Sequence, residues 1–84
     1  MNEFFKFFNE KRRHFPMHLT ISYCKICDWM IEITKRGCAS DYPKARHIDN
    51  DVLIVSVQDG DMELCFTKAY VALKEWLLEF DGGY

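Results

Sequence analysis

The sequence predicts a small α+β domain in the order helix, three strands, helix, with a long C-terminal helix packed on a mainly antiparallel three-stranded sheet. Three patterns predict this fold class. Residues 18–24 and 28–35 alternate apolar and polar side chains, as half-buried strands do. Residues 52–57 are apolar at nearly every position, which is typical of a buried strand. Residues 61–80 repeat apolar side chains at the spacing of one helix face.

The N-terminal segment predicts a short helix over residues 2–13, because Phe4, Phe5 and Phe8 share one helical face. Pro16 ends any helix before it. We therefore divide the chain into an N-terminal helical arm (1–16) and a single core domain (17–84), with Met17 as an alternative start. We expect the arm to lie on the sheet face opposite the C-terminal helix, or in a contact between two copies.

The first two strands are predicted to be antiparallel neighbours, because only the short stretch around residues 25–27 connects them. Residues 36–50 are rich in turn-forming side chains and predict an irregular loop. A loop of this length is unusual in so small a domain, and such loops often carry function.

The last two elements are a strand and a helix joined by a sharp turn. The apolar strand 52–57 is expected to be central and covered on both faces. Asp59 or Asp61 can cap the helix that follows, and Gly82 suits its C-terminal end. The predicted buried stripe of this helix consists of Met62, Phe66, Ala69, Leu73, Trp76 and Phe80.

Composition limits the class of protein. The chain has 84 residues, 49% of them hydrophobic and 15% aromatic, which supports one folded core. No apolar run approaches the roughly 20 residues that span a membrane, and no secretory signal is recognisable, so we expect a cytoplasmic protein. Basic and acidic residues are unevenly distributed along the chain. Residues 1–48 carry nine Lys and Arg and five Asp and Glu, whereas residues 49–84 carry two Lys and eight Asp and Glu.

The cysteines suggest one candidate metal site. Cys24, Cys27, Cys38 and His47 have the spacing C-x2-C-x10-C-x8-H, which could hold zinc and staple a small domain. We do not recognise this spacing from a zinc family, so the main expectation is no cofactor, with a zinc-stapled nucleic-acid-binding or regulatory module as the alternative. Cys65 is expected to be a small hydrophobe in the core.

Binding residues are expected in the long loop and in the acidic second half of the chain. The acidic side chains do not form a calcium loop, and they act either as helix caps and solvated loop or as a face for a basic partner. No set of acid, base and nucleophile is recognisable, so we expect a binding protein and no enzyme. The predicted contact residues are Tyr42, Asp49, Asp51, Asp59, Asp61 and Glu63.

The element order is also that of double-stranded-RNA-binding domains. Those domains place basic side chains at the start of the last helix, where this chain has Asp59, Asp61 and Glu63. Acidic groups repel phosphate, so direct nucleic-acid binding is not expected.

From Met17 onward the chain resembles a group of small proteins carried by bacteriophages and related mobile elements. The segments that carry the resemblance are 21–23, 25–29, 56–59, 61–66, 74–78 and 82–84. The resemblance implies a phage gene context and no particular activity. By analogy with anti-CRISPR proteins, it predicts a non-enzymatic inhibitor that binds a host defence protein or ribonucleoprotein complex in the host cytoplasm. A homodimer is a further expectation.

Overall fold

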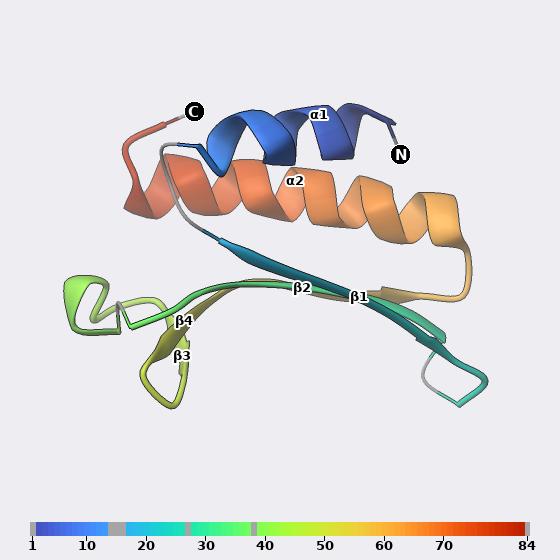
Figure 1. Ribbon diagram of the computed structural model, residues 1–84, viewed down its shortest axis with the longest axis horizontal. Helices are drawn as coiled ribbons and strands as arrows, with labels where there is room; N and C mark the ends of the chain where they lie inside the picture. The colour runs from blue at the N-terminus through green and yellow to red at the C-terminus, as the bar shows by residue number, and fades with distance from the viewer. Residues whose placement is uncertain (1, 14–16, 27, 38, 84) are drawn as a thin grey trace.

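The computed structural model describes residues 2–13, 17–26, 28–37 and 39–83. Its elements follow the predicted α+β order with one additional strand (Figure 1). They are α1 (Asn2–Lys11), β1 (His18–Cys24), β2 (Asp28–Lys35), the 3-10 turn η1 (Ala39–Asp41), β3 (Arg46–Ile48), β4 (Asp51–Asp59) and α2 (Met62–Phe80).

The strands form one antiparallel sheet in the order β1-β2-β4-β3. The predicted hairpin of β1 and β2 is confirmed, with Ile21 opposite Ile31. The predicted alternation of burial is confirmed for β2, because Ile31 and Ile33 are fully buried under α2, whereas in β1 only Leu19 is half-buried and the other residues are exposed. The side chains that alternate with them, such as Glu32, belong to the face that α2 does not cover.

The sheet has four strands, so the prediction of three strands was one short. The additional strand β3 lies inside the segment that we expected to be irregular, and it pairs with the start of β4. Ile48 opposes Asp51 across a tight turn in which Asp49 has φ 55°. Aspartate enters this left-handed region more readily than most residues, so the turn can close within two residues. Three paired residues carry too little periodicity to be recognised in a sequence.

Strand β4 is central, but the described residues cover only one of its faces, so the expectation of cover on both faces was wrong. The reason for its apolar sequence is a bulge. Val55 opposes Ile33 and Leu53 opposes Thr34, which leaves Ile54 without a partner in the register. Ile54 and Val55 are both buried although they are adjacent, as a bulge allows. On the uncovered face of the same strand, Ser56 is exposed.

Helix α2 begins and ends close to the predicted positions. Asp61 is the N-cap, and its carboxylate accepts hydrogen bonds from the N–H groups of Glu63 and Leu64. At the other end Gly82 has φ 79°, and the N–H of Gly83 closes the last turn on the carbonyl of Leu77 at 3.0 Å. The predicted stripe is confirmed: its four central members are buried and its ends are half-buried. The buried members are Phe66, Ala69, Leu73 and Trp76.

Helix α1 lies alongside α2, on the same side of the sheet (Figure 1). The expectation that it covers the opposite face was therefore wrong. Phe4 is 1% exposed and belongs to the same buried cluster as α2 and the sheet. The physical reason is that the opposite face carries polar side chains such as Thr20 and Ser56, which offer an apolar helix little to bury.

Among the described residues, none of the helices has both the length and the apolar character needed to span a membrane.

Candidate functional site

A groove lies where the C-terminal half of α2 faces the segment between η1 and β4. It consists of two adjoining hollows of about 320 and 330 Å³, which share Lys44, Glu79 and Phe80. We call this surface the Tyr42 groove. Its lining includes the aromatic and charged side chains of Tyr42, Lys44, Arg46, Glu75, Trp76, Glu79 and Phe80.

Three aromatic side chains in contact, with their rings tilted against one another, form the floor of the Tyr42 groove. Trp76 and Phe80 are four residues apart on α2, which places them on one helix face, and their ring centroids are 5.1 Å apart. The ring of Tyr42 lies 5.2 Å from that of Trp76. The ammonium group of Lys35 lies 5.3 Å from the centre of the Tyr42 ring, within the range of a cation–π interaction.

The backbone of Tyr42 is held in place by two hydrogen bonds to its carbonyl. The N–H of Ala45 donates one at 3.1 Å, which closes a turn around Pro43. Nε2 of His47 donates the other at 2.7 Å, so His47 must carry a proton on Nε2. These bonds fix the loop that carries Tyr42 to strand β3, and the groove is therefore built on anchored backbone.

Charges of both signs surround the aromatic floor. Lys44 and Arg46 come from the loop and β3, whereas Glu75 and Glu79 come from one face of α2. All four side chains are exposed. Exposed charges at the rim contribute to selection and orientation of a partner more than to affinity.

The predicted contact residues do not form one surface. Tyr42 lines the groove, whereas Asp49 lies in the turn between β3 and β4, and Asp51 begins β4 and accepts a hydrogen bond from the N–H of Gly37 at 3.1 Å. Of the remaining three, Asp59 ends β4, Asp61 caps α2 and Glu63 lies in the first turn of α2. A strand of nine residues is about 30 Å long, which separates the two groups.

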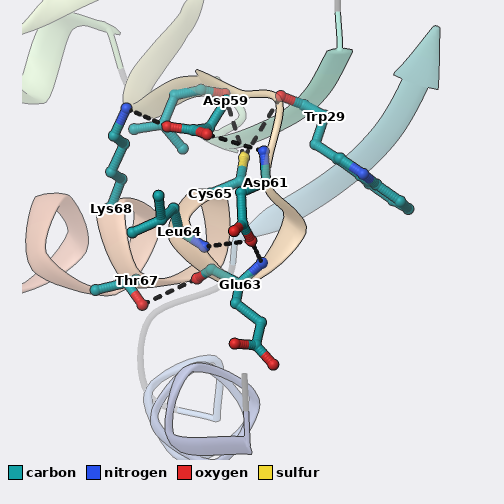
Figure 2. A network of polar contacts seen from close by, with 9 residues as sticks. Trp29, Asp59, Asp61, Glu63, Leu64, Cys65, Thr67 and Lys68 are labelled. Atoms are coloured by element: carbon teal, nitrogen blue, oxygen red, sulfur yellow. Dashed lines mark hydrogen bonds and ion pairs between the residues drawn. The ribbon is translucent and has the colours of Figure 1, made fainter. Parts of the chain in front are cut away.

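The acidic turn before α2 has structural partners within the chain (Figure 2). Asp61 caps the helix, and Asp59 accepts from the N–H of Asp61 at 2.9 Å. Asp59 also pairs with Lys68 at 2.6 Å. The hydrogen bond from Lys68, followed by that from Asp61, holds the pKa of the Asp59 carboxyl below its usual range. Of the three predicted acidic contacts, Glu63 is the one whose side chain projects away from these bonds (Figure 2).

The four predicted zinc ligands are not brought together by the described structure. Cys24 is at the end of β1, in register with Asp28, whereas His47 is in β3, in register with Val52. These positions are at opposite ends and opposite edges of the sheet, too far apart for zinc bonds of about 2.0–2.3 Å. Cys27 and Cys38 lie outside the described residues. Within the described ranges, no three His, Cys, Asp or Glu side chains are grouped around a common metal position.

Cys65 is fully buried on α2, as predicted. Its thiol donates to the carbonyl of Trp29 at 3.5 Å and contacts that of Val57 at 3.9 Å (Figure 2). Burial, assisted by the nearby charge of Asp59, raises the pKa of this thiol. The group is therefore a packed, neutral core residue.

Most of the Tyr42 groove was not predicted from the sequence. Trp76 and Phe80 were expected in the buried stripe of the helix, and no role was expected for Lys44, Arg46, Glu75 or Glu79. One signal was present: Glu75 and Glu79 are four residues apart and flank Trp76, which places two carboxylates beside an aromatic ring. The basic side of the groove could not be found, because β3 itself was not recognised.

The fold and this groove define a small α+β domain with one helix-covered sheet face and one open sheet face. Comparison of the chain with protein families, with curated proteins and with solved structures finds no match.

Proposed function

We propose that this chain is a non-enzymatic binding protein that holds a segment of a partner protein in the Tyr42 groove. The observation that carries the proposal is the cluster of contacting rings of Tyr42, Trp76 and Phe80 beside exposed charges of both signs. Tyrosine and tryptophan supply much of the binding energy at protein interfaces when they are surrounded by a polar rim. The expected partner segment presents an apolar side chain to this floor and has an acidic and a basic residue beside it.

The anchoring of Tyr42 supports this use of the groove. A binding surface loses less entropy on association when its side chains are already ordered. Here the two hydrogen bonds to the Tyr42 carbonyl and the packing on Trp76 order the loop before a partner arrives.

The resemblance of residues 17–84 to phage proteins supplies the setting. We propose that the partner is a protein of a host defence complex in the cytoplasm, and that binding blocks the complex as anti-CRISPR proteins do. Shape and charge complementarity are sufficient for such an inhibitor, and no chemical step is required of it.

The acidic turn is a weaker candidate for this contact. Asp59 and Asp61 are engaged with Lys68 and with the start of α2, so replacing them disturbs the helix. Surface variants should therefore avoid both residues. Glu63 is exposed and provides a matched charge change at that end of the molecule.

The test is a tagged pull-down from host-cell lysate, with and without nuclease, read by mass spectrometry. We expect a discrete protein complex that the wild-type chain captures in both samples. The double variant Lys44→Glu/Arg46→Glu should lose this complex, whereas Glu63→Lys should retain it. Circular dichroism of each variant shows whether the fold is kept.

Three outcomes would overturn the proposal. Capture that vanishes with nuclease indicates nucleic-acid binding. If Glu63→Lys loses the captured complex and the double variant retains it, the contact lies at the acidic turn. If the folded double variant captures the complex as well as the wild type does, the groove is not part of the interface. Once the partner is known, phage plating on hosts that carry the defence system tests inhibition.

A further inference from the structure

Strand β1 is a long free edge of the sheet. In the order β1-β2-β4-β3 it pairs with β2 along all seven residues, from His18 to Cys24, and no described residues pair with its other side. Alternate residues of an edge strand direct their N–H and C=O groups away from the sheet. The outer side of β1 is therefore the edge at which a further strand can continue the sheet.

The two edges of the sheet differ in protection. The β3 edge is three residues long and begins with Arg46, and short, charged edges resist pairing with another chain. Residues 18–24 contain no Lys, Arg, Asp, Glu or Pro, so nothing in their composition opposes pairing. Six of the seven side chains are exposed, and Leu19 is half-buried.

We propose that β1 pairs antiparallel with β1 of a second copy of this chain, with the two-fold axis at Ile21. In this register Ile21 faces its own copy, Leu19 faces Tyr23, and Thr20 faces Ser22. Apolar side chains thus meet apolar ones on the helix-covered side, and hydroxyls meet hydroxyls on the other. No like charges oppose one another, as they commonly would in a charged edge strand.

The register with the axis at Ile21 is favoured over its neighbours. It pairs all seven residues, whereas an axis at Thr20 or Ser22 pairs five of them. If the axis lies between two residues, a residue of one face is opposed by a residue of the other face. Directly opposed side chains point to the same side of a sheet, so the second copy must then lie upside down relative to the first. That arrangement would place the helices of the two copies on opposite faces and would set Ile21 against Ser22.

The helix-covered side of β1 has apolar surface that a second copy would cover. Helix α2 lies over β4 and β2, so Ile21 remains 37% exposed and Tyr23 57% exposed. Tyr23 packs on Trp29 with ring centroids 5.0 Å apart, which holds its ring on this side. In the dimer these side chains lie at the centre of a continuous sheet, between the helix layers of both copies.

The dimer leaves the Tyr42 groove accessible, because the groove is beside β3 and β4 at the opposite edge from β1. The inference does not depend on the proposed function. It adds that two grooves are carried at the outer ends of one assembly, which increases the avidity for a partner with repeated sites.

The first test is the mass of the full chain by sedimentation velocity over a range of concentrations. We expect about twice the chain mass of 10.0 kDa. The variant Ile21→Glu should return the mass to that of one chain, because two carboxylates then face each other at the axis. The matched control is Val71→Glu on α2, an exposed apolar position outside the interface. It should keep the doubled mass.

Disulfide trapping tests the register independently. Opposed residues of antiparallel strands have Cα atoms about 4.5–5.5 Å apart, which a disulfide can bridge. In a background with Cys24, Cys27 and Cys38 replaced by Ser, Ile21→Cys should form a covalent dimer on mild oxidation, and Val71→Cys should not. A single-chain mass for the wild type, or a dimer that Ile21→Glu leaves intact and Ile21→Cys does not trap, would overturn the proposal.

Discussion

The ring of Phe4 in α1 packs against the ring of Phe66 in α2, with centroids 5.5 Å apart and planes inclined by 59°. Both side chains are nearly fully buried, at 1% and 3% exposure. Neighbouring ring contacts, such as Phe7 with Tyr70 at 5.3 Å, extend this contact between the helices. The N-terminal helix is therefore packed into the core that α2 forms with the sheet.

Replacing Phe4 should test this packing directly. We expect Phe4→Ala to lower the free energy of unfolding by about 3–5 kcal/mol, because it removes a buried aromatic ring and leaves a cavity. Urea denaturation followed by circular dichroism measures the change. Phe5 is the matched control because its side chain is 43% exposed. Phe5→Ala should therefore lower the free energy of unfolding clearly less than Phe4→Ala does. Equal losses for the two variants would contradict the packing of α1 described above.

The N-cap of α2 gives a second prediction. Asp61→Ala leaves the N–H groups of Glu63 and Leu64 without their side-chain acceptor and should cost about 1 kcal/mol of stability. Asp61→Asn retains an oxygen acceptor and should lose much less. The same denaturation experiment compares the two variants. If Ala were tolerated as well as Asn, the cap would have no role in stability.

The pair between Asp59 and Lys68 predicts a pH dependence. Because the pKa of Asp59 is lowered in the folded state, the ionised carboxylate favours folding. Its contribution is complete above the unfolded pKa of about 3.9 and is lost as the pH falls through the lower folded value. The melting temperature of the wild type should therefore fall more steeply below about pH 4 than that of Asp59→Asn.

Asp59→Asn is the appropriate comparison because it keeps an acceptor for the N–H of Asp61 and removes only the titrating charge. The melting temperatures should be measured in steps from neutral pH to about pH 2. Identical slopes for the wild type and the variant in the acidic range would show that the pair does not stabilise the fold.

The two described cysteines should differ in reactivity. In a variant with Cys27 and Cys38 replaced by Ser, the exposed Cys24 should react with a thiol reagent much faster than Cys65. Cys65 is buried, and its pKa is raised. The Cys65 thiol can react only when the structure around it opens. If this local opening costs about 3 kcal/mol, Cys65 should react roughly a hundredfold more slowly than Cys24. Both should react together in denaturant, and two fast thiols in the native protein would contradict the burial of Cys65.

Regular elements were predictable because their patterns are local. The alternation around Ile31 and the stripe through Leu73 repeat over enough residues to identify a strand and a helix. A cap by Asp59 or Asp61 was recognisable for the same reason, since capping involves only the next three residues, and the structure selects Asp61. The bulge at Ile54 was not predictable, because a run of apolar residues is equally consistent with a strand covered on both faces.

The candidate site was mostly unpredictable. Tyr42 was expected to bind because it lies in a long loop, but its contact with Trp76 joins residues far apart in the chain. The acidic residues were expected to act either as helix caps and solvated loop or as a face for a basic partner, and the length of β4 separates them into two groups. The proposed zinc ligands were grouped by spacing along the chain, which says little about distance across a sheet.

The sequence by itself determined the α+β class, the hairpin, the buried stripe of α2 and its N-cap, because each depends on side chains within a few turns or one strand. Only the tertiary structure decided the side of the sheet on which α1 packs, the presence of β3, the location of the Tyr42 groove and the free edge of β1. These features depend on which surfaces remain apolar after the first elements have packed. Which surfaces pack together depends on the apolar surface of the whole chain, so a local sequence pattern cannot predict it.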